Sequence, residues 1–293
     1  MTKLTGTVAR VVIAFAVALV AFTGGAAAVF AGPSVIAGWT GRVRVETLGD
    51  RDYRTYEPAH RAARTSLVLD LHGTHENGFL EESFTRFDRQ ADRLGWVVAY
   101  PDGVDGGWEP FGCCHRAGVD DVAFISALID HFRATDGIDA VYVMGSSRGA
   151  MMAYRLACEL SSRITAVAAV EGNMADANAN VDGVQCPLAH SVSVLAIHGT
   201  ADSAVPIKGG GRFAPFVDVV GKWRRLDGCA PAGVVRAGGT DMTWSCSAGT
   251  QVRSIVVPGG GHSWPGAPLA NLPWTAAGSL DASRIIADFF AAR

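Results

Sequence analysis

The feature that most constrains the fold is an alternation of short apolar runs with helical segments along the chain. The apolar runs predict strands at Ser66–Leu71, Trp96–Tyr100, Val141–Met144, Ile164–Val170, Val192–Ile197 and Val252–Val257. Helical periodicity predicts helices at Leu80–Leu94, after Asp120, and at Ala150–Leu160, Phe216–Leu226 and Ser283–Phe290. Strands that are apolar throughout are buried on both faces. We therefore expect an α/β fold with a mostly parallel central sheet and helices on both faces.

Composition narrows the class of protein. The chain has 293 residues, of which 49% are hydrophobic and 18% are charged, which excludes a disordered chain and allows a sizeable core. A formal net charge of −3 excludes a polybasic nucleic-acid-binding protein. No linker, repeat or low-complexity stretch follows residue 40, so we expect residues 32–293 to form a single domain.

The N-terminal segment has the pattern of a secretory signal peptide. Lys3 and Arg10 precede an apolar run at Val11–Phe22, and small residues follow as far as Ala31. This pattern predicts that residues 1–31 are a signal peptide, cleaved after Ala28 or Ala31. The alternative is an uncleaved membrane anchor, because residues 11–31 are just long enough to span a bilayer. We expect a secreted protein with no stable membrane insertion after cleavage.

The cysteines are even in number, which in an exported protein favours disulfides. Six cysteines allow 15 pairings, and the sequence does not decide between them. We expect Cys229 to pair with Cys246 across a Gly-rich excursion, and Cys158 to pair with Cys186. This leaves Cys113 with Cys114, although a bridge between adjacent cysteines is strained and other partners are open to both. No pair has the C-x-x-C spacing typical of zinc sites, so we expect no metal and no cofactor.

A candidate nucleophile lies between a predicted strand and a predicted helix. Ser147 is the central residue of a G-x-S-x-G sequence formed with Gly145 and Gly149. A serine at a sharp strand-to-helix turn, flanked by glycines that allow close approach, is the arrangement of a nucleophile elbow. The alternative is an ordinary turn with a capping serine, a role that Ser146 fits better.

A serine nucleophile needs a base and an acid that orients the base. His262 follows the last predicted strand in a Gly-rich loop, and Asp202 follows the strand before it. The chain order Ser147, Asp202, His262 is that of α/β hydrolases. Glu171, at the end of the preceding strand, is the second candidate for the acid.

Two backbone amides are candidates for an oxyanion hole. The amide of Arg148 follows the nucleophile at a helix N-terminus, where the helix dipole favours negative charge. The amide of Thr74 lies in the loop that follows His72 and Gly73. We interpret His72 as a residue that shapes this loop.

Several motifs together give the chain a family resemblance. They are LHGTHENG (71–78), the segment 108–130 with WEPFGCC at its start and VDDVAFISALID at its end, VYVMGSSRG (141–149), HGTADSAVP (198–206) and GGGHSWPG (259–266). In these motifs the chain resembles the secreted polyhydroxybutyrate-depolymerase-like esterases of the α/β hydrolases, which include feruloyl and acetylxylan esterases. The resemblance implies an α/β-hydrolase catalytic domain with Ser147, Asp202 and His262 as the triad, and Thr74 and Arg148 at the oxyanion hole. The chain departs from the family pattern at Arg148 and Ala150.

The resemblance also indicates roles for residues outside the triad. Trp108 and Trp264 are candidates for apolar walls that bind the substrate, with core packing as the alternative. Asp120 and Asp121 belong to the shared pattern, and we interpret them as a helix cap and a loop anchor.

We therefore expect a monomeric serine carboxylic-ester hydrolase that works through an acyl-enzyme. Since no Ser/Thr- or Pro-rich linker leads to a second domain, we expect soluble esters or short oligomers as substrates. The alternatives are an acyltransferase to a sugar or lipid hydroxyl, and a non-catalytic binding protein on a hydrolase fold.

Overall fold

The computed structural model describes residues 40–111, 114, 117–176, 178–267 and 280–293. The predicted signal peptide lies outside the described residues, as does Cys113. Within the described part of the chain, no helix has the length and apolar character needed to cross a bilayer.

Ten strands of the described residues form one sheet. They are β1 (Arg42–Leu48), β2 (Arg51–Glu57), β3 (Ser66–Leu71), β4 (Val97–Pro101), β5 (Ala140–Ser146), β6 (Ala166–Val170), β7 (Ser193–Gly199), β8 (Val234–Arg236), β9 (Asp241–Ser245) and β10 (Gln251–Val257). Their spatial order is β1-β2-β4-β3-β5-β6-β7-β10-β9-β8. The strands from β4 to β10 in this order pair in parallel, and both edges of the sheet are antiparallel. The predicted mostly parallel sheet is confirmed.

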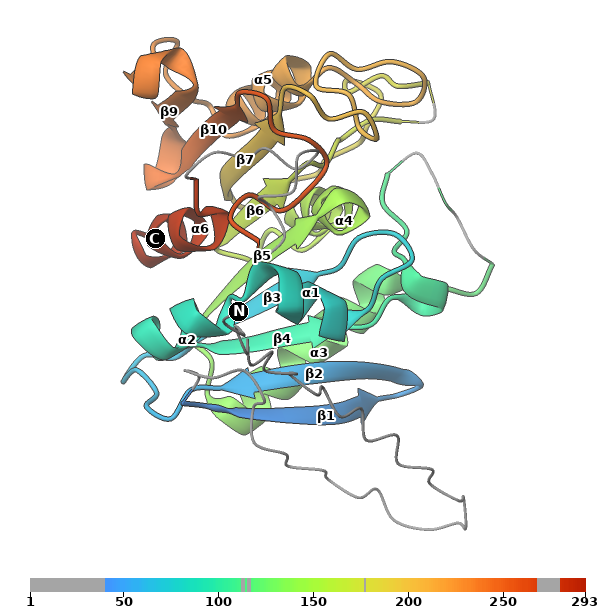
Figure 1. The fold of residues 1–293 in the computed structure, drawn as a ribbon, viewed down its shortest axis with the longest axis vertical. Coiled ribbons are helices and arrows are strands. Elements are labelled where there is room, and N and C mark those ends of the chain that lie inside the picture. The colour runs from blue at the N-terminus through green and yellow to red at the C-terminus, as the bar shows by residue number, and fades with distance from the viewer. Residues whose placement is uncertain (1–39, 112–113, 115–116, 177, 268–279) are drawn as a thin grey trace, which may run out of the picture.

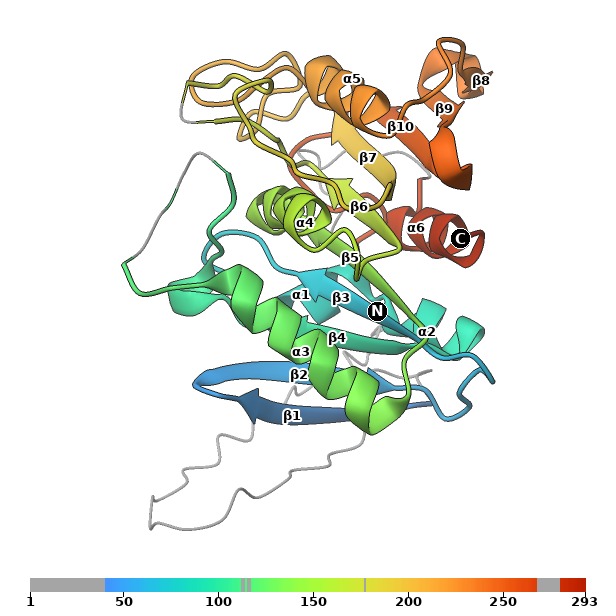
Figure 2. The same cartoon turned by 180° about the vertical axis from the view of Figure 1, so that it is seen from behind.

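Helices cover both faces of the sheet, as predicted. The described helices are α1 (Gly78–Thr85), α2 (Asp88–Leu94), α3 (Asp121–Asp136), α4 (Ser147–Glu159), α5 (Phe216–Leu226) and α6 (Ala282–Ala291). Figure 1 shows α1, α2 and α6 on one face, and Figure 2 shows α3, α4 and α5 on the other. Each face has its own apolar core: Ile125, Tyr154 and Trp223 pack on the second face, and Phe87 and Phe290 pack on the first.

The predicted helix at Leu80–Leu94 is wrong, because the structure divides it into α1 and α2. The break is at Arg86, whose φ of 47° is left-handed. The carbonyl of Thr85 accepts a hydrogen bond from the hydroxyl of Ser283 on α6, and the hydroxyl of Thr85 donates to Asp70 on β3. These tertiary contacts hold the chain at the point where the helix is interrupted.

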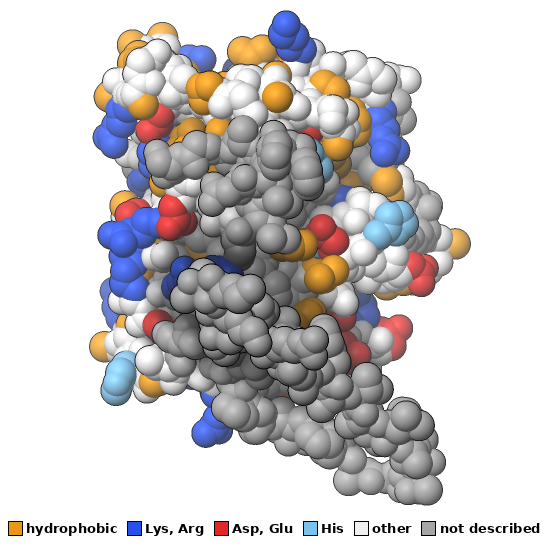
Figure 3. Space-filling model, viewed as in Figure 1, with side chains coloured by type: hydrophobic (Ala, Val, Ile, Leu, Met, Phe, Trp, Pro, Cys, Tyr) orange, Lys and Arg blue, Asp and Glu red, His pale blue; other side chains and the backbone are white. Residues whose placement is uncertain are grey.

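Two of the predicted disulfides are confirmed. Cys158, near the end of α4, is bonded to Cys186 in the long connection between β6 and β7. Cys229, after α5, is bonded to Cys246, after β9. The third predicted pair includes Cys113, which lies outside the described residues. On the face drawn in Figure 3, basic and acidic side chains lie next to one another at several places.

Candidate active site

Ser147 lies at a sharp turn between β5 and α4. Its φ of 50° is left-handed, which is strained for a serine and typical of a nucleophile elbow. The turn fits against β3 only because glycines flank it: a Cβ on Gly149 would lie 1.9 Å from the Leu71 carbonyl oxygen, and one on Gly145 would lie 2.6 Å from the same atom. The sequence therefore places the serine hydroxyl at the carboxyl edge of the parallel strands.

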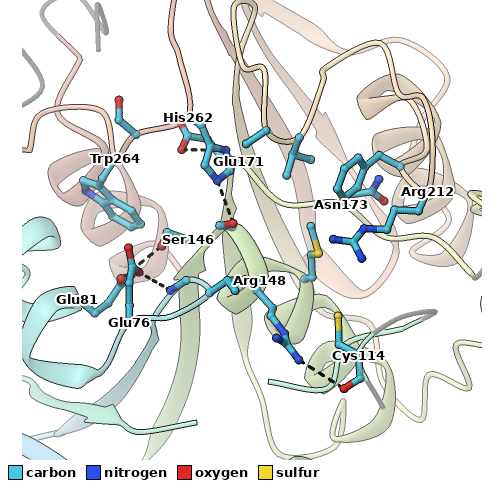
Figure 4. A pocket seen from close by; sticks show the side chains of 18 of the residues that line it. Glu76, Glu81, Cys114, Ser146, Arg148, Glu171, Asn173, Arg212, His262 and Trp264 are labelled. Carbon is cyan, nitrogen blue, oxygen red and sulfur yellow. Dashed lines mark hydrogen bonds and ion pairs between the residues drawn. The ribbon is translucent and has the colours of Figure 1, made fainter. Parts of the chain in front are cut away.

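The structure brings the three predicted triad residues together (Figure 4). The Nε2 atom of His262 is 3.0 Å from the Oγ of Ser147, and its Nδ1 is 2.8 Å from the Oδ2 of Asp202. These residues follow β10, β5 and β7, whose carboxyl ends meet at one edge of the sheet. The imidazole therefore lies between the hydroxyl and the carboxylate, which is the geometry that base-assisted nucleophilic attack requires.

Asp202 is buried but surrounded by donors. Its Oδ1 accepts the backbone N–H groups of Ala204 and Val205, at 2.9 and 2.8 Å. Its Oδ2 also lies 3.3 Å from the Nε2 of His198, a residue that the sequence analysis did not identify. Burial alone would raise the pKa of Asp202, but the hydrogen bonds from His198 and His262 outweigh burial and hold it well below its usual range. Asp202 is therefore the charged acid beside the imidazole.

Glu171, the second candidate acid, lies beside His262 without forming a hydrogen bond to it. It follows β6 with a left-handed φ of 56°, and its Oε2 is 3.8 Å from the Nδ1 of His262. Burial raises the pKa of Glu171 to about 9, and the nearby charge of Asp202 also raises it. Glu171 therefore carries a proton at neutral pH.

Thr74 and Arg148, the predicted oxyanion-hole residues, both line the cavity beside Ser147. Arg148 is in the first turn of α4, where backbone N–H groups point past the helix N-terminus. The loop before Thr74 is held by His72, whose Nδ1 is 2.7 Å from the Gly73 carbonyl oxygen and whose Nε2 accepts the Gly103 N–H. Burial lowers the pKa of His72, which favours the neutral ring that can donate at one nitrogen and accept at the other.

The prediction that Trp108 forms a wall of the pocket is wrong. Its side chain is fully buried in the core, donates its indole N–H to the His72 carbonyl oxygen, and is not among the described residues that line the cavity. Its carbonyl accepts the guanidinium of Arg148, so Trp108 supports the cavity from behind. Trp264 does line the cavity, as predicted, with its indole N–H donated to Ser283.

The predicted cap and anchor roles of Asp120 and Asp121 are confirmed. The side chain of Asp120 accepts the Ala123 N–H at the start of α3. Asp121 is fully buried, pairs with Arg51 on β2 at 2.6 Å, and accepts the Glu109 N–H. It thereby ties α3 to the loop that carries Trp108.

The cavity in front of Ser147 has a volume of about 560 Å³. Polar residues that the sequence analysis did not identify line it beside the triad: Glu76, Glu81, Asn173, Asp176 and Arg212. Glu76 lies within the quoted LHGTHENG motif and Glu81 follows it by three residues, so both could have suggested a role, whereas Asn173 and Arg212 lie in loops with no recognisable pattern. The apolar residues that line it include Phe84, Phe111, Met151, Phe213 and Trp264.

Among the described residues, Glu171, Asp202 and His262 are the group whose ligand atoms lie close enough to hold a metal ion, within 4.8 Å of one another. Both ring nitrogens of His262 are already used, one toward Asp202 and the other toward Ser147. The hydrogen bonds of His262 are those of a proton-transfer site, and these three residues do not fit a metal ion.

Comparisons with known proteins identify the family of the chain. Residues 119–230 match the family model described as Phospholipase/Carboxylesterase. The chain is 31% identical over 237 residues to NocK of Nocardia uniformis subsp. tsuyamanensis, a protein named as an esterase, covering 71% of this chain and 67% of that protein. It is 26% identical over 249 residues to the bifunctional acetylxylan esterase/xylanase XynS20E of Neocallimastix patriciarum, covering 80% of this chain but 35% of that protein.

Among solved structures, an acetyl xylan esterase from Aspergillus awamori has the same fold. The TM-score is 0.59 at 16% identity, and the match covers 80% of this chain and 99% of that one. The relatives and the fold agree, and this chain belongs to the esterases of the α/β-hydrolase family.

Proposed function

We propose that the protein is a serine esterase that hydrolyses carboxylic esters through Ser147, His262 and Asp202. The observation that carries the proposal is the hydrogen-bonded line from the Ser147 hydroxyl through the His262 ring to the Asp202 carboxylate, with distances of 3.0 and 2.8 Å. Its position at the carboxyl edge of the sheet, beside a cavity of about 560 Å³, supports a small-molecule reaction.

In the first half of the reaction, Ser147 Oγ attacks the ester carbonyl carbon and its proton passes to the Nε2 of His262. The charge that develops on the carbonyl oxygen is accepted by the backbone N–H groups of Thr74 and Arg148. Asp202 holds the Nδ1–H of His262 and stabilises the imidazolium. The carbon–oxygen bond to the alcohol then breaks, and the leaving alkoxide takes the proton from His262.

In the second half, a water molecule attacks the acyl-enzyme. His262 takes one proton from this water, and a second tetrahedral intermediate forms at the same oxyanion site. Collapse of this intermediate releases the acid, and the proton on His262 returns to the Ser147 oxygen. The enzyme is then ready for another ester.

The substrates that we propose are soluble esters or short oligomers. A cavity of about 560 Å³ is within the range of sites for small ligands, roughly 300–1,000 Å³. Because a relative and a structural neighbour are named as acetylxylan esterases, acylated sugars and aryl esters are the first compounds to screen. Export is part of the proposal, and the disulfides Cys158–Cys186 and Cys229–Cys246 support it because such bonds persist in oxidising compartments.

Labelling with a fluorophosphonate probe, together with turnover of a 4-nitrophenyl ester, tests the proposal. Ser147→Ala should fold normally, lose the label and lower turnover by an amount of order 10⁶, as in a well-studied serine hydrolase. Ser146→Ala is the matched control, because it removes the adjacent hydroxyl, which donates to Glu81. A label that persists in Ser147→Ala and disappears in Ser146→Ala would overturn the assignment of the nucleophile.

A further inference from the structure

The two sides of the cavity differ in charge (Figure 4). Glu76 and Glu81 lie on the side of Trp264, and Arg148 and Arg212 lie on the opposite side. Burial raises the pKa of Glu76 and that of Glu81, so both acids resist ionisation. The arginines therefore favour a negatively charged group of the substrate on the second side, and the acids of the first side, which burial keeps neutral, offer no such attraction.

The two arginines are held differently. The guanidinium of Arg148 is buried and donates to the carbonyl oxygens of Trp108 and Cys114, so it fastens the loop behind the cavity. Arg212 is exposed, and Figure 4 shows its side chain extending from its loop toward the interior of the cavity. Its guanidinium lies 5.4 Å from the ring centre of Phe213, and no described residue forms an ion pair with it.

Asn173 adds a buried acceptor beside this cation. Its side chain is 6% exposed and lines the cavity. The Nδ2 of Asn173 is 3.4 Å from the Ala214 carbonyl oxygen, which fixes the direction of the amide and ties the loop of Arg212 to the end of β6. The Oδ1 of Asn173 receives no hydrogen bond from the described residues, and a buried acceptor without a hydrogen bond is destabilising.

A further carboxylate, that of Asp176, also lines the cavity. The Oδ1 of Asp176 accepts the backbone N–H groups of Asn178 and Asn180, both at 2.9 Å. Asp176 forms no ion pair with Arg212 in the described part of the chain, so the positive charge of Arg212 remains available to a ligand.

We propose that Arg212 and Asn173 form a subsite for a carboxylate on the substrate, with Asn173 Oδ1 accepting a neighbouring hydroxyl or N–H of the same group. The inference rests on the proposed esterase function and specifies its substrate class: esters in which the acid or the alcohol part carries a second, free carboxylate. Guanidinium groups bind carboxylates through charge-assisted hydrogen bonds, which gives the subsite both its affinity and its preference for an anion.

Three esters, assayed on the wild-type enzyme and on Arg212→Gln, test whether the subsite binds a carboxylate and whether that carboxylate belongs to the acid or to the alcohol part of the ester. The 4-nitrophenyl half-ester of adipic acid carries a carboxylate on the acyl part, and the hexanoate ester of 4-hydroxybenzoate carries one on the alcohol part. The 4-nitrophenyl ester of hexanoic acid is the neutral reference. Arg212→Gln should lower kcat/KM about tenfold for one of the two anionic esters, and leave the neutral ester within about twofold.

Lys208→Gln is the matched control. Lys208 is an exposed cation on the same loop and is not among the described residues that line the cavity, so its loss should leave the three esters nearly unchanged. The preference of the wild type for the anionic ester should also weaken as salt is added.

Two outcomes would overturn the subsite. One is an equal loss of activity on all three esters in Arg212→Gln, and the other is no change on any of them. Failure of the proposed function has a different signature, because a wild-type enzyme that hydrolyses none of the esters and does not bind the fluorophosphonate probe would not be an esterase at all.

Discussion

Asp202 and Glu171 both lie beside His262, but Asp202 is charged and Glu171 is neutral at pH 7. They follow the neighbouring strands β7 and β6, both are buried, and they lie 2.8 and 3.8 Å from the Nδ1 of His262. Four donors surround Asp202: two backbone N–H groups and the two histidines. Glu171 accepts the backbone N–H of Ser263, and burial raises its pKa to about 9.

The difference teaches that hydrogen-bond donors can outweigh burial in deciding whether a carboxyl group is charged. Burial opposes ionisation of both groups, and only Asp202 has enough hydrogen bonds to outweigh it. Once Asp202 is charged, its field raises the pKa of Glu171 further. The site therefore holds one negative charge beside the imidazole, and a second carboxyl that stays neutral.

The strongest test of this comparison is to neutralise each carboxyl in turn. Asp202→Asn should lower kcat by an amount of order 10⁴, the loss seen when the equivalent aspartate of a serine protease is changed in the same way. Glu171→Gln replaces a protonated acid by an amide of the same shape, so kcat should stay within about threefold of wild type. Both are measured as turnover of a soluble aryl ester at pH 7.5.

The reverse ranking would break the comparison. If Glu171→Gln were far more damaging than Asp202→Asn, Glu171 would be the acid that orients His262. Circular dichroism and thermal unfolding of both variants would confirm that the losses do not come from misfolding.

A double variant sharpens the comparison. In Asp202→Asn the charge that helps to raise the pKa of Glu171 is gone, so Glu171 should ionise more easily and accept the Nδ1–H of His262 from its nearby position. The residual kcat of Asp202→Asn should then rise about tenfold between pH 7 and pH 9. Adding Glu171→Gln should abolish this rise. A rise that persists in the double variant would show that Glu171 does not substitute for Asp202.

How much of the fold could be predicted depends on whether an element is determined by its own residues or by contacts with residues far away in the sequence. The strand at Ser66–Leu71 and the helix at Phe216–Leu226 have the predicted bounds, because each is encoded by its own periodicity. The hairpin of β1 and β2 was missed, although Gly49, with a φ of 67°, marks its turn. Its strands are partly exposed and lack a continuous apolar run, as does β8, which is exposed throughout.

The hydrogen-bonded arrangement of Ser147, His262 and Asp202 could be predicted because each residue lies in a local motif at the end of a strand. The break at Arg86 could not, since it depends on a hydrogen bond between Thr85 and Ser283, which are 198 residues apart in the sequence. The burial of Trp108 likewise depends on packing against His72 and Arg51. The neutral state of Glu171 follows from burial and from the charge of Asp202, and neither can be read from the residues around it.

The last expected effect is on stability, and its sign follows from the raised pKa of Glu171. The folded protein keeps the Glu171 proton up to about pH 9, whereas the unfolded chain releases it near the ordinary value of 4.5. Between these pH values the folded state binds one more proton than the unfolded state. The contribution of this proton to the free energy of unfolding is therefore complete below about pH 4.5 and is lost as the pH rises toward 9. One proton gives a slope of at most about 1.4 kcal/mol per pH unit.

Glu171→Gln removes this titration, so its free energy of unfolding should fall less steeply than that of wild type between pH 5 and pH 8.5, as measured by urea denaturation. Asp70→Asn is the control, because burial raises the pKa of Asp70 to about 7 and its contribution to the slope should end near that pH. Above pH 7.5 the two variants should therefore separate, with Asp70→Asn parallel to wild type and Glu171→Gln flatter. Parallel curves for wild type and Glu171→Gln over the whole range would mean that Glu171 is already ionised in the folded protein. The contrast with Asp202 would then lie in geometry alone, and not in charge.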